Sequence, residues 1–157
     1  MTERAQENLP TILLVEDDPS DAALLCRGFE KANVLNPIVH LKDGDSALGY
    51  LAGAGVYADR KKFPLPALML LDLKMPGMTG LQLLQWMRVH PEVRRIPVVV
   101  LTSDEDPATV NAAYDLGANS YLVKPGDPAH IAIMIETLQR YWIELNQPPQ
   151  LVMRAQT

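Results

Sequence analysis

The polar and apolar positions of this chain form short runs of branched aliphatic residues, which alternate with longer segments of mixed polarity. The runs occupy residues 11–15, 38–41, 67–71, 97–101 and 120–123. Each run is too short for a helix and is rich enough in Val, Ile and Leu to be a strand, in most cases one buried on both faces. The alternation of these runs with helix-length segments predicts a parallel sheet with right-handed crossovers and helices on both faces.

Three of the five expected helices begin with an aspartate followed by a proline. The aspartate side chain accepts hydrogen bonds from the first free backbone amides of a helix, and proline suits the first helical position. These dipeptides are Asp18-Pro19, Asp106-Pro107 and Asp127-Pro128. The expected helices span residues 19–32, 43–51, 81–89, 107–117 and 128–144.

The composition fits one compact domain, because 48% of the 157 residues are hydrophobic and 21% are charged. We expect an N-terminal segment at residues 1–10, the domain at 11–145 and a tail at 146–157. The net charge of -5 gives no footprint for nucleic acid, and we expect the basic cluster at residues 60–62 to be a solvated loop. With one cysteine, no signal peptide and no apolar run of membrane-spanning length, a cytoplasmic protein is expected.

Polar side chains follow four of the five expected strands. Glu16 and Asp17 follow the first strand, and Asp72 follows the third. Thr102 and Lys124 follow the last two strands. Ligands of open parallel sheets bind beyond the carboxyl ends of the strands, so we expect these side chains to share one site.

The residue types at this edge suit the transfer of a phosphoryl group to a carboxylate. Phosphoryl transfer requires positioning and charge neutralisation, and clustered carboxylates provide the oxygen ligands that Mg²⁺ or Mn²⁺ prefers. Asp17 and Asp72 are expected to bind the ion directly, Glu16 directly or through water, and Lys74 through its backbone carbonyl. Asp72 is the candidate phosphoacceptor. Without a metal, three crowded carboxylates would repel one another, which should raise some of their pKa values.

Four motifs occur in order along the chain: Ile12–Pro19 (ILLVEDDP), Leu70–Gly77 (LLDLKMPG) with Gly80, Val100–Ser103 (VLTS) and Gly117–Pro125 (GANSYLVKP). Together they resemble the receiver domain of bacterial response regulators, and the resemblance covers residues 11–145. It implies an α/β, CheY-like (flavodoxin-like) doubly wound fold with five strands in the order 2-1-3-4-5 and five helices. It also implies phosphorylation by a sensor histidine kinase in the presence of a divalent metal.

The resemblance also implies roles for the remaining polar residues. Lys124 would pair with Asp72 at rest and with a phosphoryl oxygen afterwards, while Thr102 and Ser103 would bind the phosphoryl group. The family places a cis peptide bond before the proline that follows the lysine, here Pro125, which would aim the lysine inward.

The family further implies a switch made of a hydroxyl residue and an aromatic residue. The hydroxyl residue moves toward the phosphoryl group and leaves room for the aromatic side chain to turn inward. Thr102 and Tyr121 are the matching pair in this chain. Their movement would alter the surface made by the fourth helix, the last strand and the last helix.

The last helix is unusually apolar for one that has to cover only one face of a sheet. A stripe at positions 131, 135, 138, 142 and 145 would be enough to cover the core. The remaining apolar side chains would be partly exposed: Ile133, Met134, Tyr141 and Ile143. Exposed apolar surface of this kind favours a partner, so we expect a homodimer through the fourth helix, last strand and last helix.

Two further features are similar to stand-alone response regulators associated with bacterial phytochromes. They are the long connection Gly53–Pro66, which contains Tyr57-Ala58-Asp59, and the Tyr141-Trp142 ending. This narrower resemblance implies a phytochrome histidine kinase or phosphatase as the partner. Gly126 and Lys74 depart from residues common in the family, so the lifetime of the phosphorylated form stays open. The cognate kinase and the downstream target also stay open.

Alternative functions are weaker on the same residues. A phosphatase with an aspartate nucleophile needs a second acid two residues later, where this chain has Lys74. The sequence from Gly53 to Ala58 fits G-x-G-x-x-A, but it follows a helix instead of linking a strand to a helix, as dinucleotide binding requires. A phosphate sink or relay, or an adaptor that is never phosphorylated, are the alternatives that stay open.

Overall fold

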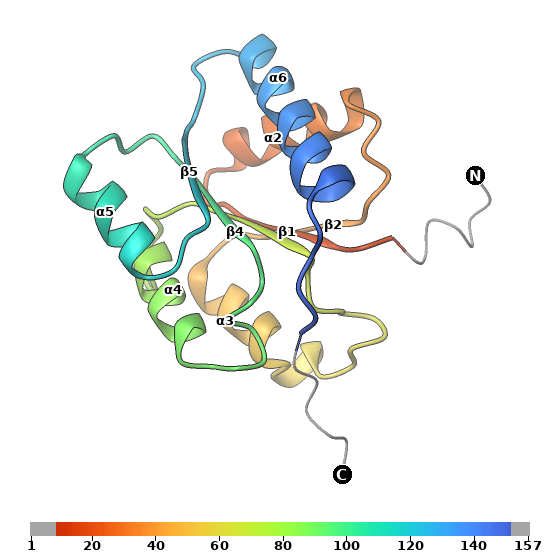
Figure 1. Cartoon of the computed structure of the whole chain (residues 1–157), viewed down its shortest axis with the longest axis vertical. Coiled ribbons are helices and arrows are strands. Elements are labelled where there is room, and N and C mark those ends of the chain that lie inside the picture. Colours follow the sequence, from red (N-terminus) through yellow and green to blue (C-terminus); the bar gives the residue numbers. More distant parts are fainter. Residues whose placement is uncertain (1–8, 152–157) are drawn as a thin grey trace.

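The chain is described here by a computed structural model over residues 9–151, which form a parallel sheet between two layers of helices (Figure 1). The elements are β1 (Ile12–Val15), α2 (Pro19–Lys31), β2 (Ile38–Leu41), α3 (Gly44–Ala52), β3 (Leu68–Leu71), α4 (Gly80–Arg88), β4 (Val98–Thr102), α5 (Pro107–Asp115), β5 (Ser120–Val123) and α6 (Pro128–Leu138). A 3-10 turn, η1 (Gly55–Tyr57), and a π-helical segment, η2 (Gln139–Leu145), complete the order. The five strands lie in the order β2-β1-β3-β4-β5, and all are parallel to their neighbours. The predicted fold is confirmed.

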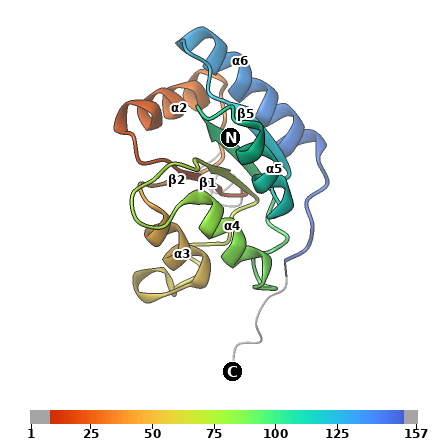
Figure 2. The same ribbon diagram turned by 90° about the vertical axis from the view of Figure 1, so that its left-hand side faces the viewer.

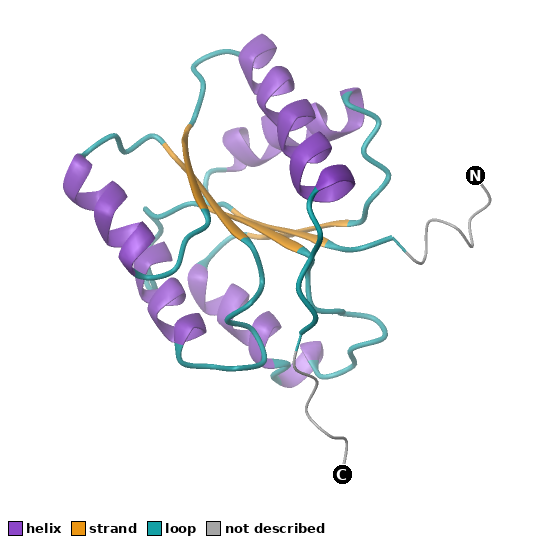
Figure 3. Ribbon diagram, viewed as in Figure 1, coloured by secondary structure: helices purple, strands orange, loops and turns teal. Residues whose placement is uncertain are grey.

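The strands divide their side chains between the two helical layers, because successive residues of a strand point to opposite faces. Leu13 and Met69 face the layer of α3, α4 and α5, whereas Ile12 and Leu68 face α2 and α6. Figures 2 and 3 show the sheet between the two layers. All of the residues of β1, β3 and β4 are buried, which explains why these strands are nearly continuous apolar runs.

The aspartates predicted to begin helices do so in the structure. Asp18 accepts hydrogen bonds from the amides of Ser20 and Asp21, at 2.8 and 3.0 Å. Asp106 and Asp127 make equivalent contacts at the starts of α5 and α6. Each aspartate has an extended backbone and is followed by proline at the first helical position.

The long connection between α3 and β3 is held to the domain by side-chain contacts. Arg60 donates to the backbone carbonyls of Tyr50 and Leu51 at the end of α3, in both cases at 2.7 Å. The rings of Tyr50, Tyr57 and Phe63 contact one another, with centroids 5.2 to 6.1 Å apart. The interpretation of residues 60–62 as a solvated loop is therefore wrong for Arg60, which satisfies carbonyls that the end of a helix leaves free.

The last helix changes its winding after Leu138, and the prediction that Leu145 is buried is therefore wrong. Ile131, Ile135 and Leu138 are buried, as the predicted stripe requires, but Leu145 is 77% exposed. Residues 139–145 form a π-helix, in which hydrogen bonds run from residue i to i+5 and each turn contains more residues. The extra residue rotates Leu145 away from the core, and Ile143 packs against the core instead.

The segment after η2 passes from the α6 side of the sheet toward α3 (Figure 1). Leu151 packs against the core of the α3, α4 and α5 layer, and Arg95 donates to the carbonyl of Gln150 at 3.4 Å. Most of the expected N-terminal segment, residues 1–8, and the end of the expected tail, residues 152–157, lie outside the described residues. Among the helices within residues 9–151, none has the length and apolar character needed to cross a membrane.

Candidate phosphoryl-acceptor and metal site

Backbone hydrogen bonds beyond the ends of the strands fix the predicted site residues. The amide of Glu16 donates to Leu41, and that of Asp72 donates to Val15, each at 3.0 Å. The amide of Lys124 donates to the carbonyl of Thr102 at 2.8 Å. These bonds continue the parallel ladders by one residue, so the site residues inherit the rigidity of the sheet.

Three carboxylates gather at this edge of the sheet. One oxygen from each of Glu16, Asp17 and Asp72 lies within 4.8 Å of the others. Glu16 is 1% exposed and Asp72 is 6% exposed, whereas Asp17 is partly exposed. A cluster of carboxylate oxygens with one member open to solvent has the donor set for a hard divalent cation and a route by which the ion can enter.

Lys124 places its ammonium group among the carboxylates. Its Nζ lies 2.7 Å from Glu16 Oε2, 2.8 Å from Asp21 Oδ2 and 3.1 Å from Asp72 Oδ2. The lysine side chain is only 15% exposed, so the ammonium group exchanges most of its hydration for these three partners. The structure thus brings the predicted Lys124 and Asp72 together.

Burial and charge shift two pKa values at the site in the same direction. Burial raises the pKa of Glu16 to about 7, although the hydrogen bond from Lys124 lowers it, and the charge of Asp72 raises it further. Burial lowers the pKa of Lys124, but the hydrogen bonds with Asp21 and Glu16 and the charge of Asp72 outweigh this effect and raise the pKa. A raised carboxyl pKa was expected from repulsion between carboxylates, but loss of hydration is the larger cause.

Thr102 and Ser103 differ in their surroundings. The Thr102 side chain is buried at the end of β4, and its hydroxyl accepts a hydrogen bond from the amide of Asp104 at 3.4 Å. Ser103 is exposed to solvent. Thr102 is thus buried and paired with Lys124 through its backbone carbonyl, whereas Ser103 faces solvent.

A chain of contacts joins the acceptor loop to Tyr121. The amide of Lys74 donates to Asp72 Oδ1 at 3.3 Å, and Lys74 Nζ lies 3.7 Å from Asp104 Oδ2. The hydroxyl of the half-buried Tyr121 donates to the backbone carbonyl of Asp104 at 2.7 Å. The loop after β4 thus touches both the acceptor loop and the aromatic residue of the predicted switch.

The expected cis bond before Pro125 is not found, because the described residues contain no cis peptide bond. The prediction is therefore wrong for this structure. The trans form of a bond before proline is ordinarily favoured by about 0.5–1 kcal/mol. Lys124 reaches Asp72 with the trans bond, so the cis form is not needed to aim the lysine inward.

Two contacts at the site were missed in the sequence. Asp21 binds Lys124, and its place in the first turn of α2, four residues after Asp17, is a weak local signal of that role. His40 Nε2 lies 2.8 Å from the carbonyl oxygen of Glu16, and this contact joins β2 to the site. Neither residue belongs to the four sequence motifs. Both contact residues that are distant in the chain, so the motifs alone do not predict their roles.

Gly80 allows α4 to begin directly beneath the acceptor loop. Its amide donates to the carbonyl of Leu73 at 3.0 Å. A Cβ at this position would meet the carbonyl oxygen of Asp72 and would lie 2.7 Å from Leu73 Cα. The missing side chain is therefore what lets the helix support the backbone of the acceptor.

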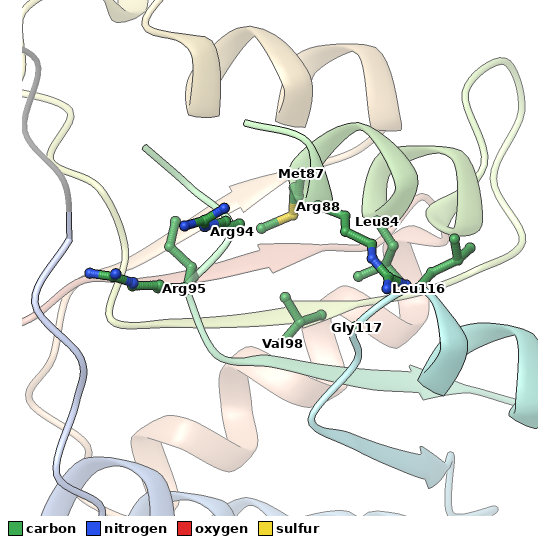
Figure 4. Close-up of a pocket in the computed structure, with 9 residues that line it drawn as sticks. Leu84, Met87, Arg88, Arg94, Arg95, Val98, Leu116 and Gly117 are labelled. Carbon is green, nitrogen blue, oxygen red and sulfur yellow. The ribbon is translucent and has the colours of Figure 1, made fainter. Parts of the chain in front are cut away.

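A cavity of about 380 Å³ lies away from the carboxylates, between α4 and the loop that leads to β4 (Figure 4). Arg88, Arg94 and Arg95 line it together with apolar residues. Arg88 already donates to the carbonyl of Asp115, and the three guanidinium groups point in different directions. The cavity therefore contains no converging set of charges, and it takes no part in the chemistry of the site.

The doubly wound sheet, with acidic side chains and a lysine at its carboxyl edge, defines a class of signalling proteins that carry a phosphoryl group on an aspartate. Comparison with known proteins gives the family. The model of the response regulator receiver domain matches residues 12–136. This chain therefore belongs to the response regulator receiver family and is a phosphoacceptor signalling protein.

Individual relatives support the same assignment. The response regulator Rcp1 of Synechocystis sp. (strain ATCC 27184 / PCC 6803 / Kazusa) is 34% identical over 133 residues, which are 85% of this chain and 88% of Rcp1. A crystal structure of Rcp1 in its Mn²⁺-bound form has a TM-score of 0.81 at 33% identity, over 90% of this chain and 99% of Rcp1.

Two further crystal structures share the fold. The phosphorylated cyanobacterial phytochrome response regulator RcpA has a TM-score of 0.84 at 30% identity. The response regulator RPA3017, which functions in red light signalling of R. palustris, has a TM-score of 0.85 at 34% identity. Both comparisons cover 90% of this chain and 99% of the other chain. The chain is thus similar over 90% of its length to a phytochrome response regulator and to a response regulator in red light signalling.

Proposed function

We propose that this receiver accepts a phosphoryl group on Asp72 from a sensor histidine kinase, with Mg²⁺ or Mn²⁺ bound beside it. The observation that carries the proposal is the position of Asp72. It follows the central strand β3, it is almost fully buried, and its Oδ2 lies 3.1 Å from the Lys124 ammonium group. Glu16 and Asp17 lie beside this carboxylate at the same edge of the sheet.

The residues present fit a divalent cation. Glu16, Asp17 and Asp72 each contribute an oxygen to a cluster of suitable size, and the backbone carbonyl of Lys74 would add a further ligand. When bound, the ion would neutralise the negative charge on the phosphoryl oxygens. The Mn²⁺-bound form of the relative Rcp1 supports this choice of ion.

The transfer itself needs one nucleophile and no additional reactant. An oxygen of Asp72 attacks phosphorus as the bond between phosphorus and the imidazole nitrogen of the donor breaks. The electron pair of that bond stays on the nitrogen, which then takes up a proton. Lys124 and the Thr102 hydroxyl would each donate a hydrogen bond to a phosphoryl oxygen, and Ser103 would do so from the rim.

The contacts around Asp104 support a switch that involves Tyr121. A phosphoryl group on Asp72 would draw Thr102 and the loop after β4 toward it. That loop also holds the Tyr121 hydroxyl through the carbonyl of Asp104. A change at Asp72 would therefore alter the position of Tyr121 and, with it, the surface of α5, β5 and α6.

The same surface is the proposed dimer interface. It carries exposed apolar side chains from each of its elements: Tyr114 on α5, Val123 on β5, and Ile133, Tyr141 and Leu145 on α6 and η2. Exposed apolar groups that lie on neighbouring elements mark a surface for protein association. A second copy of this chain would bury them, and phosphorylation would act on the same face.

The proposed kinase partner is a bacterial phytochrome or a related light-sensing histidine kinase. Support comes from the similarity to RcpA and RPA3017, whose structures are described as a phytochrome response regulator and as part of red light signalling. The same acceptor chemistry would also serve a phosphate sink or relay. Phosphotransfer from a purified phytochrome kinase, followed over time, distinguishes a fast cognate pair from slow cross-reaction.

The proposed chemistry is tested by incubation with a small acyl phosphate and Mg²⁺, followed by intact mass measurement. Wild type should gain one phosphoryl group, and Asp72→Asn should gain none. Asp59→Asn, which removes an exposed carboxylate far from the site, is the matched control and should behave as wild type. Equal labelling of wild type and Asp72→Asn would contradict the proposal.

A further inference from the structure

One partner of Lys124 lies outside the cluster of metal-binding carboxylates. Lys124 Nζ contacts Glu16, Asp21 and Asp72, but only Glu16 and Asp72 belong to that cluster. Asp21 lies in the first turn of α2, where its amide donates to Asp18. Its side chain is 41% exposed, so it approaches the ammonium group from the rim of the site.

The lysine and a divalent cation would share the same carboxylates. A metal bound at Glu16 and Asp72 would lie close to the Lys124 ammonium group, which is 2.7 Å from Glu16 Oε2 and 3.1 Å from Asp72 Oδ2, and two cations on shared ligands repel each other. This repulsion favours a position of the ammonium group farther from Glu16 when the metal binds. Because its side chain is mostly buried, it then needs another anionic partner close by.

Asp21 is that partner. It is already 2.8 Å from Nζ, and no metal ligand would be lost if the lysine moved toward it. From there the ammonium group is still beside Asp72, where the phosphoryl group would form. The hydrogen bonds of Asp18 fix the start of α2, and this keeps Asp21 close to the Lys124 ammonium group.

We propose that Asp21 is a positioning residue, which holds the Lys124 ammonium group at the rim of the site while a divalent cation occupies Glu16, Asp17 and Asp72. This inference rests on the proposed metal-assisted function and extends it. Asp21 lowers the competition between lysine and metal, and it keeps the lysine within reach of the phosphoryl oxygens.

A different result is expected if Asp21 only stabilises the helix and attracts cations through its charge. An acidic residue in the first turn stabilises a helix through its dipole by about 0.3–1 kcal/mol, whatever residue occupies position 124. Its negative charge would also attract a metal ion whether or not Lys124 is present. A positioning role requires instead that the effect of Asp21 on metal binding depends on Lys124.

A double-mutant cycle with Mn²⁺ separates the two roles. Calorimetry would measure Mn²⁺ binding to wild type, Asp21→Asn, Lys124→Met and the double variant. Glu30→Gln, which removes one exposed charge at the far end of the same helix, is the control. Chemical denaturation of each protein would show that all are folded under the conditions of the titration.

We expect Asp21→Asn to weaken Mn²⁺ binding by about tenfold when Lys124 is present, and by about twofold or less when it is replaced. Glu30→Gln should bind as wild type does. An equal factor in both backgrounds, or no weakening by Asp21→Asn, would overturn the inference but leave the proposed function intact. Failure of the wild type to bind Mn²⁺ would overturn both.

A spectroscopic measurement tests the inference without replacing Lys124. In the Mg²⁺-loaded wild type, the ammonium protons of Lys124 should be visible in proton–nitrogen spectra, since a held ammonium group exchanges slowly with water. In Mg²⁺-loaded Asp21→Asn the signal should be lost. Its persistence in the variant would overturn the inference.

Discussion

The Lys124 ammonium nitrogen lies 2.7 Å from the carboxylate of Glu16, so an internal cation occupies the acidic cluster of this receiver. Glu16 is 1% exposed and cannot recover hydration if that partner is removed. The lysine therefore has two effects on the site. It stabilises the carboxylates when no metal is bound, and it competes with a metal for their oxygens.

Replacement of Lys124 by methionine should destabilise the metal-free protein. The change leaves Glu16 and Asp72 without their cation, and breaking a buried pair from one side typically costs about 3–5 kcal/mol. Partial exposure of the lysine places our expectation at about 2–3 kcal/mol at neutral pH. Urea denaturation in the presence of a chelator measures the loss, and Mn²⁺ should restore part of the stability. A variant as stable as wild type would contradict the pairing.

The stability of the metal-free protein should fall between about pH 5 and pH 8. Burial raises the pKa of Glu16 from 4.5 to about 7, so within this window the folded protein keeps a proton that the unfolded chain has released. The free energy of unfolding then decreases with rising pH, by an amount on the order of 1–3 kcal/mol from this group.

Glu16→Gln is the control for this pH dependence, because glutamine does not titrate. The variant should lack the Glu16 contribution to the slope in a series of denaturation curves. The raised pKa of Lys124 lies above its ordinary value of 10.5, so the lysine stays charged in both states and does not alter the slope. Identical slopes for wild type and variant would contradict the raised pKa of Glu16.

Gly80→Ala should disturb the acceptor loop. The added methyl group would overlap the backbone of Asp72 and Leu73, and overpacking of this kind typically costs about 1–3 kcal/mol. Displacement of Asp72 should also slow its phosphorylation. Gly49→Ala is the matched control, since a Cβ at that position would lie 3.8 Å or more from its nearest neighbour, Tyr57. Gly80→Ala should lose stability and be labelled more slowly, whereas Gly49→Ala should show neither change.

Ile133→Glu should dissociate the proposed dimer. Ile133 is 61% exposed on α6, within the apolar surface shared by α5, β5 and η2. A buried charge at an interface has no partner, so the variant should sediment as a monomer at micromolar concentration. Val56→Glu changes an exposed apolar residue on η1 and should leave the sedimentation coefficient unchanged. A wild-type monomer at the same concentration would contradict the dimer.

The strands and most of the helices could be predicted because their signals are local. Short apolar runs that are separated by helix-length segments favour strands, and an aspartate before proline marks the first turn of a helix. The strand boundaries agree within one residue for all five strands. The edge position of Asp72 followed from the same pattern, because it comes directly after a buried strand.

The remaining features depend on contacts between distant segments. Asp21 and Lys124 are 103 positions apart, and no local pattern joins them. Leu145 is exposed because residues 139–145 form a π-helix. A prediction that assumes a regular period of about 3.6 residues does not include this change of winding. The cis bond before Pro125 came from the family resemblance alone, and nothing in the neighbouring residues required it.

The decisive measurement for the proposed chemistry is the identity of the residue that carries the phosphoryl group. After incubation with an acyl phosphate and Mg²⁺, borohydride reduction would convert an aspartyl phosphate to homoserine, and peptide mass spectrometry would locate it. Homoserine is expected at position 72, and none is expected when the metal is chelated. Homoserine at another aspartate, or unmodified Asp72 in a protein that has gained a phosphoryl group, would contradict the proposed chemistry.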